Sequence, residues 1–490
     1  MISPELRAKY TPTIGIECHV QLKTKTKLFS AVGNDAREAP PNTLVSHIDF
    51  GLPGALPVLN KQAVQLAARA AFALNSTPQL FSKFDRKHYF YPDLPMGYQI
   101  TQYDEPIVLG GSVEIVVDGV HKTIGITRAH LEADAGKSVH PVNADFSLVD
   151  LNRAGTPLLE IVSEPDMHSA AEAKAYAREL FLRMRYADVS DADLYYGNMR
   201  FDVNVSVSTT DQMGTRSETK NLNSFRSVEK AIEYEIDRQI EAIERGEAIL
   251  QETRGWDDAK LKTISQRTKE NADDYRYMPD PDLPPVIFTA EEVAAIKAQM
   301  GVTVEELRNK IHGLGASESL TEAILDQPPL VDILLATEKL LVDAGQMDRP
   351  NLGVQVTNWV GQLIPNIAEE ASKAIDELQI VPQALIDLSI MYDEAKVSST
   401  QAKAILKEVV LHGANPAAYA EEAGLMQESD EGAITAIVDQ VIAENPKAAE
   451  DVKNGEMKAI GFLTGQVMKA SQGKANPALA TQLIKRQLGI

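Results

Sequence analysis

Short stretches in which apolar and polar residues alternate dominate residues 13–288, and Gly, Pro and Asn turns separate them. Alternation with a period of two is typical of β-strands that have one buried face. In the first stretch, Ile14, Ile16 and Cys18 share one parity, whereas Glu17 and His19 share the other. Residues 227–249 instead repeat apolar positions at helical spacing. The pattern predicts an α+β domain with a largely antiparallel sheet.

The pattern changes after the proline-rich segment 280–285. From residue 289 onward the sequence is rich in Ala, Leu, Glu and Lys, and strand-like alternation is absent. A hydroxyl residue followed three positions later by Glu or Gln predicts a capped helix start, and this spacing begins at Thr289, Thr303, Ser319 and Ser398. We therefore expect the rest of the chain to be all-helical.

A Gly-Ala-Asn-Pro segment at 413–416 predicts a further break within the helical part. The sequence thus predicts three domains, namely an α+β domain over 1–288, a helical domain over 289–412 and a helical tail over 413–490.

Composition narrows the class of protein. The chain has 490 residues, of which 44% are hydrophobic and 24% are charged, as in ordinary globular proteins. Its single cysteine excludes an internal disulfide framework and a multi-cysteine zinc site. No apolar run approaches the roughly 20 residues that span a bilayer, and the N-terminus lacks a signal-peptide pattern. We expect a cytoplasmic protein without membrane contact.

Polar residues on the alternating strands form pairs at i and i+2, which project from the same side of a strand. The pairs are Glu17 with His19, Glu132 with Asp134, and Asp202 with Asn204, and a fourth segment offers Glu160 and Glu164, at i and i+4, in the same register. A solvated outer sheet face is the simple alternative for any one pair. Together, these short oxygen ligands favour Mg²⁺, which commonly also binds substrate phosphates.

Basic residues lie in two other segments. Arg86 and Lys87 precede an aromatic loop stiffened by prolines, and Arg153 lies beside a Gly-Thr-Pro turn. Arg and Lys are common phosphate ligands, so these three residues are candidates for contacts with nucleotide phosphates. The alternative for the first segment is a basic turn ahead of a core aromatic cluster.

Several long motifs, in a fixed order, resemble the B subunit of the bacterial aspartyl/glutamyl-tRNA(Asn/Gln) amidotransferase. They cover residues 15–22, 89–95, 151–160, 220–226, 252–256, 275–284 and 458–465. The resemblance implies a cradle domain with a glutamine-synthetase-like fold, followed by helical middle and tail domains. It also implies a heterotrimer with a glutaminase A subunit and a small C subunit.

The resemblance further implies a reaction. With ATP and Mg²⁺, the B subunit would phosphorylate the side-chain carboxylate of misacylated Asp-tRNA(Asn) and/or Glu-tRNA(Gln). Ammonia from the A subunit would then displace phosphate. Glu17, His19 and Glu132 match the family's catalytic metal-site positions, and Glu132 lies where ammonia emerges. Asp202 and Glu160 extend this predicted metal set, and Arg86, Lys87 and Arg153 are the residues predicted to bind ATP phosphates.

The sequence departs from the family pattern at three places, one of which is Met96, where a Lys is common. Cysteines that form an optional zinc site in many members are absent, so no zinc is expected. Tyr195 and Tyr196 replace acidic residues before the Asp202 strand. An alternative hypothesis is therefore a tRNA-binding scaffold with reduced catalysis. A remoter one is an ATP-dependent ligase for a small acid.

Charge is unevenly distributed along the chain. There are 48 Lys and Arg against 70 Asp and Glu, which gives a net charge of −22 and argues against a general nucleic-acid coat. Residues 451–490 nevertheless hold six basic and two acidic residues, a net charge of +4. We predict that this tail contacts tRNA phosphates through Lys458, Lys469, Lys474, Lys485 and Arg486.

Overall fold

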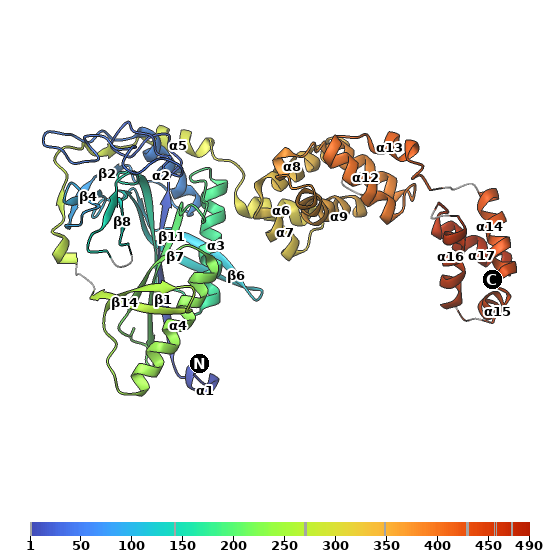
Figure 1. Ribbon diagram of the computed structural model, residues 1–490, viewed down its shortest axis with the longest axis horizontal. Helices are drawn as coiled ribbons and strands as arrows, with labels where there is room; N and C mark the ends of the chain where they lie inside the picture. The colour runs from blue at the N-terminus through green and yellow to red at the C-terminus, as the bar shows by residue number, and fades with distance from the viewer. Residues whose placement is uncertain are drawn as a thin grey trace. The chain divides into compact units, whose positions relative to one another are not determined.

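The computed structural model describes residues 2–141, 144–268, 272–346, 349–427, 431–454, 456, 458–471 and 474–490. The chain divides into two compact units, Met1–Val304 and Glu305–Ile490 (Figure 1). Helix α5 (Ala290–Ala298) packs against α2 (Lys61–Ala73) within the first unit. The predicted domain boundaries at 288/289 and 412/413 stay predictions.

A large, mostly antiparallel sheet forms the centre of the first unit, in the order β14-β13-β12-β11-β1-β10-β7-β5, with β6 also on β7. Among these pairs, only β12 and β13 run parallel in the part of the chain that the structure describes. The strands are β1 (Thr11–Gln21), β5 (Val108–Leu109), β6 (Ser112–Val117), β7 (Val120–Ala133), β10 (Pro157–Ser163), β11 (Met199–Ser208), β12 (Ser217–Leu222), β13 (Glu252–Asp257) and β14 (Lys262–Thr268). The predicted α+β class with a largely antiparallel sheet is confirmed.

Smaller elements surround the sheet. A three-stranded sheet has the order β15-β3-β4, and two strand pairs join β16 to β2 and β8 to β9. These strands are β2 (Phe81–Ser82), β3 (Asp85–His88), β4 (Tyr98–Thr101), β8 (Lys137–Val139), β9 (Leu148–Asp150), β15 (Met278–Pro279) and β16 (Val286–Ile287). The remaining helices of this unit are α1 (Pro4–Arg7), α3 (Ala170–Tyr186), α4 (Phe225–Glu244) and η1 (Ala272–Tyr275).

The apolar parity of β1 forms the core. Ile14, Ile16 and Cys18 are almost completely buried, while α3 packs against β1 and α4 against β11. Burial of these side chains is the main favourable contribution to folding. Helix α4 begins at Phe225, two residues before the predicted start, because the Ser224 hydroxyl caps it, and it ends at Glu244 rather than at 249.

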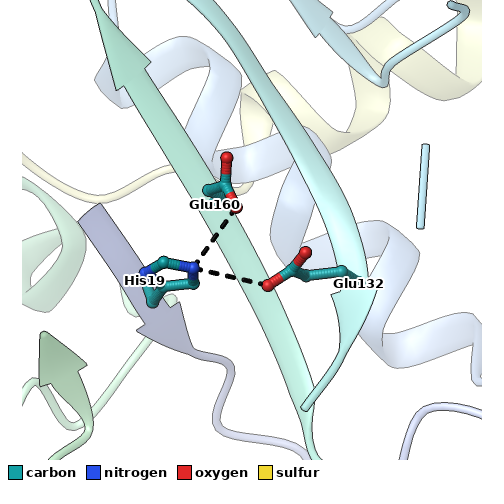
Figure 2. Close-up of side chains that lie close together, drawn as sticks. All are labelled: His19, Glu132 and Glu160. Atoms are coloured by element: carbon teal, nitrogen blue, oxygen red, sulfur yellow. Dashed lines mark ion pairs between the residues drawn. The ribbon is translucent and has the colours of Figure 1, made fainter. Parts of the chain in front are cut away.

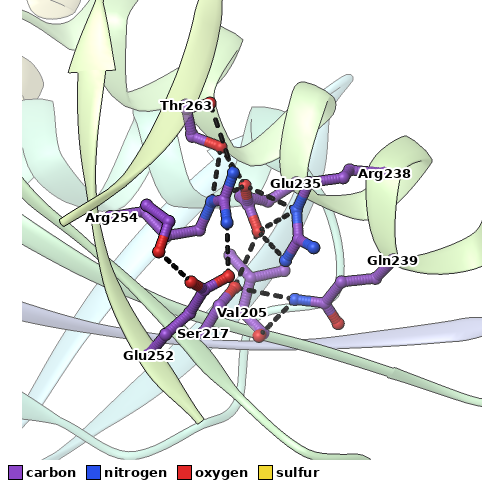
Figure 3. A network of polar contacts seen from close by, with 9 residues as sticks. Val205, Ser217, Glu235, Arg238, Gln239, Glu252, Arg254 and Thr263 are labelled. Atoms are coloured by element: carbon purple, nitrogen blue, oxygen red, sulfur yellow. Dashed lines mark hydrogen bonds and ion pairs between the residues drawn. The ribbon is translucent and has the colours of Figure 1, made fainter. Parts of the chain in front are cut away.

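A buried polar network fastens α4 to the sheet (Figure 3). Glu235 is completely buried and accepts hydrogen bonds from Ser217 Oγ at 2.7 Å and from Arg238 Nη2 at 2.8 Å. Its Oε1 lies 3.0 Å from Arg254 Nε on β13. One turn further along α4, Gln239 Nε2 donates to the Val205 carbonyl on β11 at 2.9 Å. Two arginines therefore neutralise one buried carboxylate and fix the helix over the sheet.

The second unit is helical, as the sequence predicts. It contains α6 (Val304–Gly313), α7 (Glu318–Leu325), α8 (Pro328–Asp343), α9 (Pro350–Asn358), η2 (Trp359–Leu363), α10 (Ile364–Glu370), η3 (Ile375–Glu377), α11 (Pro382–Asp393), α12 (Ser399–His412), α13 (Pro416–Glu422), α14 (Glu431–Glu444), α15 (Pro446–Lys453), α16 (Lys458–Ala470) and α17 (Pro477–Leu488). Helices α14 to α17 share an apolar core that includes Val438, Leu463 and Leu483. No described helix is both long and apolar enough to cross a membrane.

Predicted helix starts have different outcomes. Capping boxes form at Thr289 and at Ser398, as predicted. The prediction at Ser319 is wrong, because Ser317 caps α7 and its hydroxyl accepts from the Leu320 amide. The capping box at Thr303 stays a prediction.

Candidate metal and phosphate site

Strand register brings the predicted polar residues onto one face of the large sheet. On β1, Glu17 lies opposite Asp202 on β11, and His19 lies opposite Glu160 on β10. Glu160 in turn lies opposite His130 on β7. Directly opposed residues of antiparallel strands share a face. Residues almost 200 positions apart in the sequence therefore form one polar surface.

Three of these residues form a first cluster, shown in Figure 2. His19 Nε2 lies 3.2 Å from Glu160 Oε2 and 3.5 Å from Glu132 Oε1. Burial alone would lower the pKa of His19, but the hydrogen bond to Glu160 and the charges of Glu160 and Glu132 raise it to about 9. Burial would raise the pKa of Glu160, yet His130 and His19 hold it well below its usual value.

A second cluster lies beside the first and consists of Glu17, Asp202 and Glu218. One carboxylate oxygen of each lies within 4.8 Å of the others. Lys220 Nζ lies 2.7 Å from Asp202 Oδ2 and 3.3 Å from Glu218 Oε1. Burial and the charges of Glu160 and Glu218 raise the pKa of Glu17. Three carboxylates thus face one ammonium group, and the cluster holds an excess of negative charge.

Both clusters line a cavity of about 730 Å³. The lining also includes Lys87, Gln99, Tyr275 and Tyr277, which come from the small β15-β3-β4 sheet and the segment before β15. Lys87 Nζ lies 4.7 Å from the centre of the Tyr275 ring. Burial alone would lower the pKa of Lys87, but the charges of Tyr277, Glu132 and Glu160 raise it. The cavity therefore combines acidic clusters with a permanent cation.

The three predicted phosphate ligands have different positions. Lys87 lines the cavity. Arg86 pairs instead with Asp280 and Asp282, each at 2.8 Å. Arg153 donates to the carbonyls of Ala135 and Gly136. Neither Arg86 nor Arg153 is among the lining residues, so their assignment to ATP stays a prediction that the geometry does not favour.

Several charged or titratable cavity residues are absent from the sequence-based set, among them Glu218, His130, Arg128, Arg216 and Arg200. Glu218 completes the second cluster, and His130 Nε2 lies 3.7 Å from Glu132 Oε2. Arg128 and Arg216 also line the cavity. Neither arginine forms an ion pair with any residue that the structure describes, and Arg128 Nε is buried without a hydrogen-bond partner. Alternation puts His130 on the same strand face as Glu132, so the sequence could have predicted this histidine. It offers no comparable signal for Glu218 or Arg216.

The donor sets fit a divalent cation. Carboxylate oxygens are the ligands that Mg²⁺ prefers, and imidazole with carboxylate suits several transition metals. Each cluster offers one ligand atom from each of three residues, and the excess negative charge of the second one favours a cation. Glu17, Asp202 and Glu218 would hold one ion, and His19, Glu132 and Glu160 would hold another.

The remaining predicted positions lie outside this cavity. Tyr195 and Tyr196 are exposed and are not lining residues, so the replacement of acidic residues there leaves the described clusters intact. In the segment that lacks the cysteines of the optional zinc site, Lys27 Nζ is buried and lies 3.6 Å from Asp49 Oδ2. The same atom donates a hydrogen bond to the Leu44 carbonyl.

The predicted tRNA-binding residues lie on and between α16 and α17. Lys458, Lys469 and Lys474 are exposed, Lys485 is half-buried, and Arg486 pairs with Glu431.

Comparison with known proteins defines the class to which this sheet and its acidic clusters belong. The GatB/GatE catalytic domain matches residues 12–294, and the GatB domain matches residues 348–488. The matched ranges contain both the acidic cavity and α14 to α17. The chain therefore belongs to the GatB/GatE family.

Full-length relatives carry one name. A protein of Thermoanaerobacter pseudethanolicus is 46% identical over 98% of this chain and 99% of its own length. A protein of Trichodesmium erythraeum is 44% identical over 99% of this chain and 98% of its own length. A protein of Thermotoga maritima is 42% identical over 98% of this chain and 99% of its own length. Each is named as the B subunit of an aspartyl/glutamyl-tRNA(Asn/Gln) amidotransferase. The sequence-based recognition of the family is confirmed.

Proposed function

We propose that this protein is the ATP-dependent B subunit of a complex that converts misacylated Asp-tRNA(Asn) and/or Glu-tRNA(Gln) to the amidated forms. The observation that carries the proposal is the pair of acidic clusters in one cavity that is also lined by Lys87, Arg128 and Arg216, none of which forms an ion pair with a residue that the structure describes. The names of the relatives support the substrate class. A glutamine-synthetase-like cradle fold and a cytoplasmic location form part of the proposal.

The cavity chemistry suits phosphoryl transfer to a carboxylate. A carboxylate is a poor electrophile, and a phosphate on its oxygen provides a leaving group for attack by ammonia. Transfer brings anions together, so positioned cations must offset their repulsion. Bound Mg²⁺ would supply that compensation and polarise phosphoryl oxygens. Lys87, Arg128 and Arg216 would orient the phosphates, and Arg200, held by Asp134 at 3.0 Å, adds positive charge at the wall.

Ammonia must come from elsewhere in the complex. The name that the relatives carry, which designates a B subunit, implies partner subunits. We propose a glutaminase A subunit as the source of ammonia and a small C subunit as the third component. In the cluster, Glu132 contacts both histidines. It is the residue that we assign to the point where ammonia meets the activated carboxylate.

The test uses the three-subunit complex with purified misacylated tRNA. Glu132→Gln keeps the size of the side chain but removes its charge, and we expect amidation to fall by on the order of 100-fold or more, as for other preorganised charge-stabilising groups. Glu164→Gln is the control, because a bulge after Val162 takes Glu164 off the register and it contacts Thr127 instead. Wild-type amidation by Glu132→Gln would reject the site.

ATP hydrolysis separates this function from the scaffold alternative. A catalytic subunit should form ADP when misacylated tRNA is added, whereas a scaffold should not. The Tyr195–Tyr196 substitution that motivates the scaffold lies outside the cavity lining, so no observation at the site favours that alternative.

A further inference from the structure

A second cavity, of about 320 Å³, opens beside the acidic cavity. The two cavities share Glu17, Val162 and Arg216 as lining residues. Its size lies within the range of small-molecule pockets, about 300–1,000 Å³. None of the reactions proposed above uses this space.

The cavity exists because one position on the polar sheet face has no side chain. Gly15 lies opposite Asn204 in the β1–β11 register. A Cβ added at Gly15 would meet nothing closer than 3.9 Å, where Pro165 Cα and Ser163 Oγ lie. Val162, Pro165 and Met213 give the cavity apolar walls. The result is a recess with space for a flat ring.

One polar group inside the recess lacks a partner. Asn204 is buried, and its Nδ2 donates to Glu17 Oε1 at 3.1 Å. This contact turns the amide nitrogen of Asn204 toward Glu17. Asn204 Oδ1 then remains without a hydrogen-bond partner among the described residues. Because unpaired buried acceptors are costly, the recess favours a ligand that carries an N–H donor.

Arg216 lies where the two cavities adjoin, because it lines both of them. Its side chain is exposed and forms no ion pair with a described residue. A ligand with an aromatic ring in the recess and a phosphate beyond it would pass this guanidinium, which binds phosphate well.

We infer that the smaller cavity binds an adenine ring. Its exocyclic amine would donate to Asn204 Oδ1, as asparagine amides pair with adenine elsewhere, and Val162, Pro165 and Met213 would cover the ring. The inference rests on the proposed function, which supplies two adenosines, namely that of ATP and the terminal one of the tRNA 3′ end. Both present the same ring chemistry.

The first test fills the recess in the three-subunit complex. Gly15→Val adds a β-branched side chain that suits a strand, and Gly15→Ala adds less volume. Gly33→Val is the matched control, because its added Cβ would meet nothing within 4 Å and Gly33 lines neither cavity. Thermal unfolding of each complex confirms folding.

We expect Gly15→Val to raise one KM by at least about tenfold, with kcat reduced much less and Gly15→Ala intermediate. A higher KM for ATP assigns the ring to the nucleotide, and a higher KM for tRNA assigns it to the 3′ end. If neither KM changes in a folded Gly15→Ala or Gly15→Val complex, the inference is wrong. Absence of amidation in the wild-type complex would instead reject the proposed function.

The second test measures the contribution of the hydrogen bond between the adenine amine and Asn204 Oδ1. It does not depend on the folding of the Gly15 variants. Guanine presents a carbonyl where adenine presents its amine. Wild type should therefore prefer adenine to guanine, measured as the ratio of kcat/KM for ATP and GTP, or for tRNAs ending in A and G, according to which substrate the first test assigns. Asn204→Ala should reduce that ratio by at least about tenfold. An unchanged ratio would overturn the inference, even if the overall rate falls.

Discussion

At the residue scale, Arg86 and Lys87 show how a strand separates two adjacent cations. Lys87 lies opposite Gln99 across β3 and β4, and both line the cavity. Arg86 projects from the other side and pairs with Asp280, whose side chain is completely buried. We therefore expect Lys87 to contact the substrate and Arg86 to stabilise the fold.

Substitution of the two residues by Met should separate these tasks. Arg86→Met leaves Asp280 buried without a counterion and should lower the free energy of unfolding by about 3 kcal/mol. Lys87→Met should instead reduce kcat/KM for ATP by about 10- to 100-fold, because hydrogen bonds to charged groups contribute about 1.5–3 kcal/mol. Urea unfolding and steady-state kinetics measure the two effects. Equal effects of both variants on both quantities would contradict the assignment.

Glu218 provides the next residue-scale prediction. Glu218→Gln removes one of three carboxylates from the second cluster, so we expect the affinity of the complex for Mn²⁺, a spectroscopic substitute for Mg²⁺, to fall by roughly 10- to 100-fold. Glu164→Gln should leave it unchanged. Electron paramagnetic resonance titration gives both affinities, and an unaltered affinity in Glu218→Gln would exclude this residue as a ligand.

The sequence predicts the members of the clusters better than their arrangement. Glu17 and His19 share a parity within one strand, so their common face is visible in the sequence. Glu218 gives no such signal, because β12 reads Ser-Glu-Thr-Lys-Asn-Leu and lacks apolar alternation. It is a strand because β11 and β13 pair with it on both sides. Register between distant strands, which joins Glu218 to Glu17, is a tertiary property.

At the element scale, α4 is held to the sheet by the polar network around Glu235. Burial alone would raise the pKa of Glu235, but hydrogen bonds from Arg238, Thr263 and Ser217 and the charge of Arg238 lower it. A carboxyl whose pKa is lower in the folded state stabilises the protein above its unfolded pKa, near 4.5, and loses this contribution as pH falls through the folded value.

Glu235→Gln should therefore lower the free energy of unfolding by about 3 kcal/mol at pH 7, because Arg238 and Arg254 lose a buried counterion. The difference from wild type should shrink progressively below pH 4.5. Glu241→Gln, in which an exposed carboxylate of the same helix is replaced, is the control. Urea unfolding as a function of pH measures the effect, and a difference that stays constant below pH 4.5 would refute this role of the Glu235 charge.

Elements with strong local signals could be predicted, and the others could not. The α4 pattern located the helix to within two residues at its start, since apolar periodicity is local. In the small β15-β3-β4 sheet, β15 has only two residues and β3 reads Asp-Arg-Lys-His, so neither strand carries apolar alternation. The small sheet that completes the cavity was therefore not predictable from alternation.

At the scale of the whole molecule, the net charge of −22 is an average over two units whose predicted roles differ. The acidic clusters belong to the first unit, whereas the basic residues predicted to contact tRNA lie in the second. In the complex, the triple variant Lys458→Gln, Lys469→Gln, Lys474→Gln should bind tRNA with a weaker salt dependence. We expect the slope of log affinity against log salt to fall by about 2 to 3, roughly 0.9 for each phosphate that is no longer neutralised.

Arg486→Gln serves as the comparison, because Arg486 already pairs with Glu431. Its slope should change less than that of a single exposed lysine variant. Fluorescence anisotropy of labelled tRNA at several salt concentrations gives these slopes. An unchanged slope in the triple variant would place the tRNA-binding surface elsewhere.

Cys18, the single cysteine, lies between Glu17 and His19 but faces the apolar core, and burial raises the pKa of its thiol well above the usual value. Because the thiolate is the reactive form, an alkylating reagent can modify this protein only when β1 separates from the helices behind it. The rate of labelling therefore reports the free energy of opening at the strand that carries the site. Comparing this rate with and without Mg²⁺ and ATP would measure, without an activity assay, how strongly these ligands close the sheet.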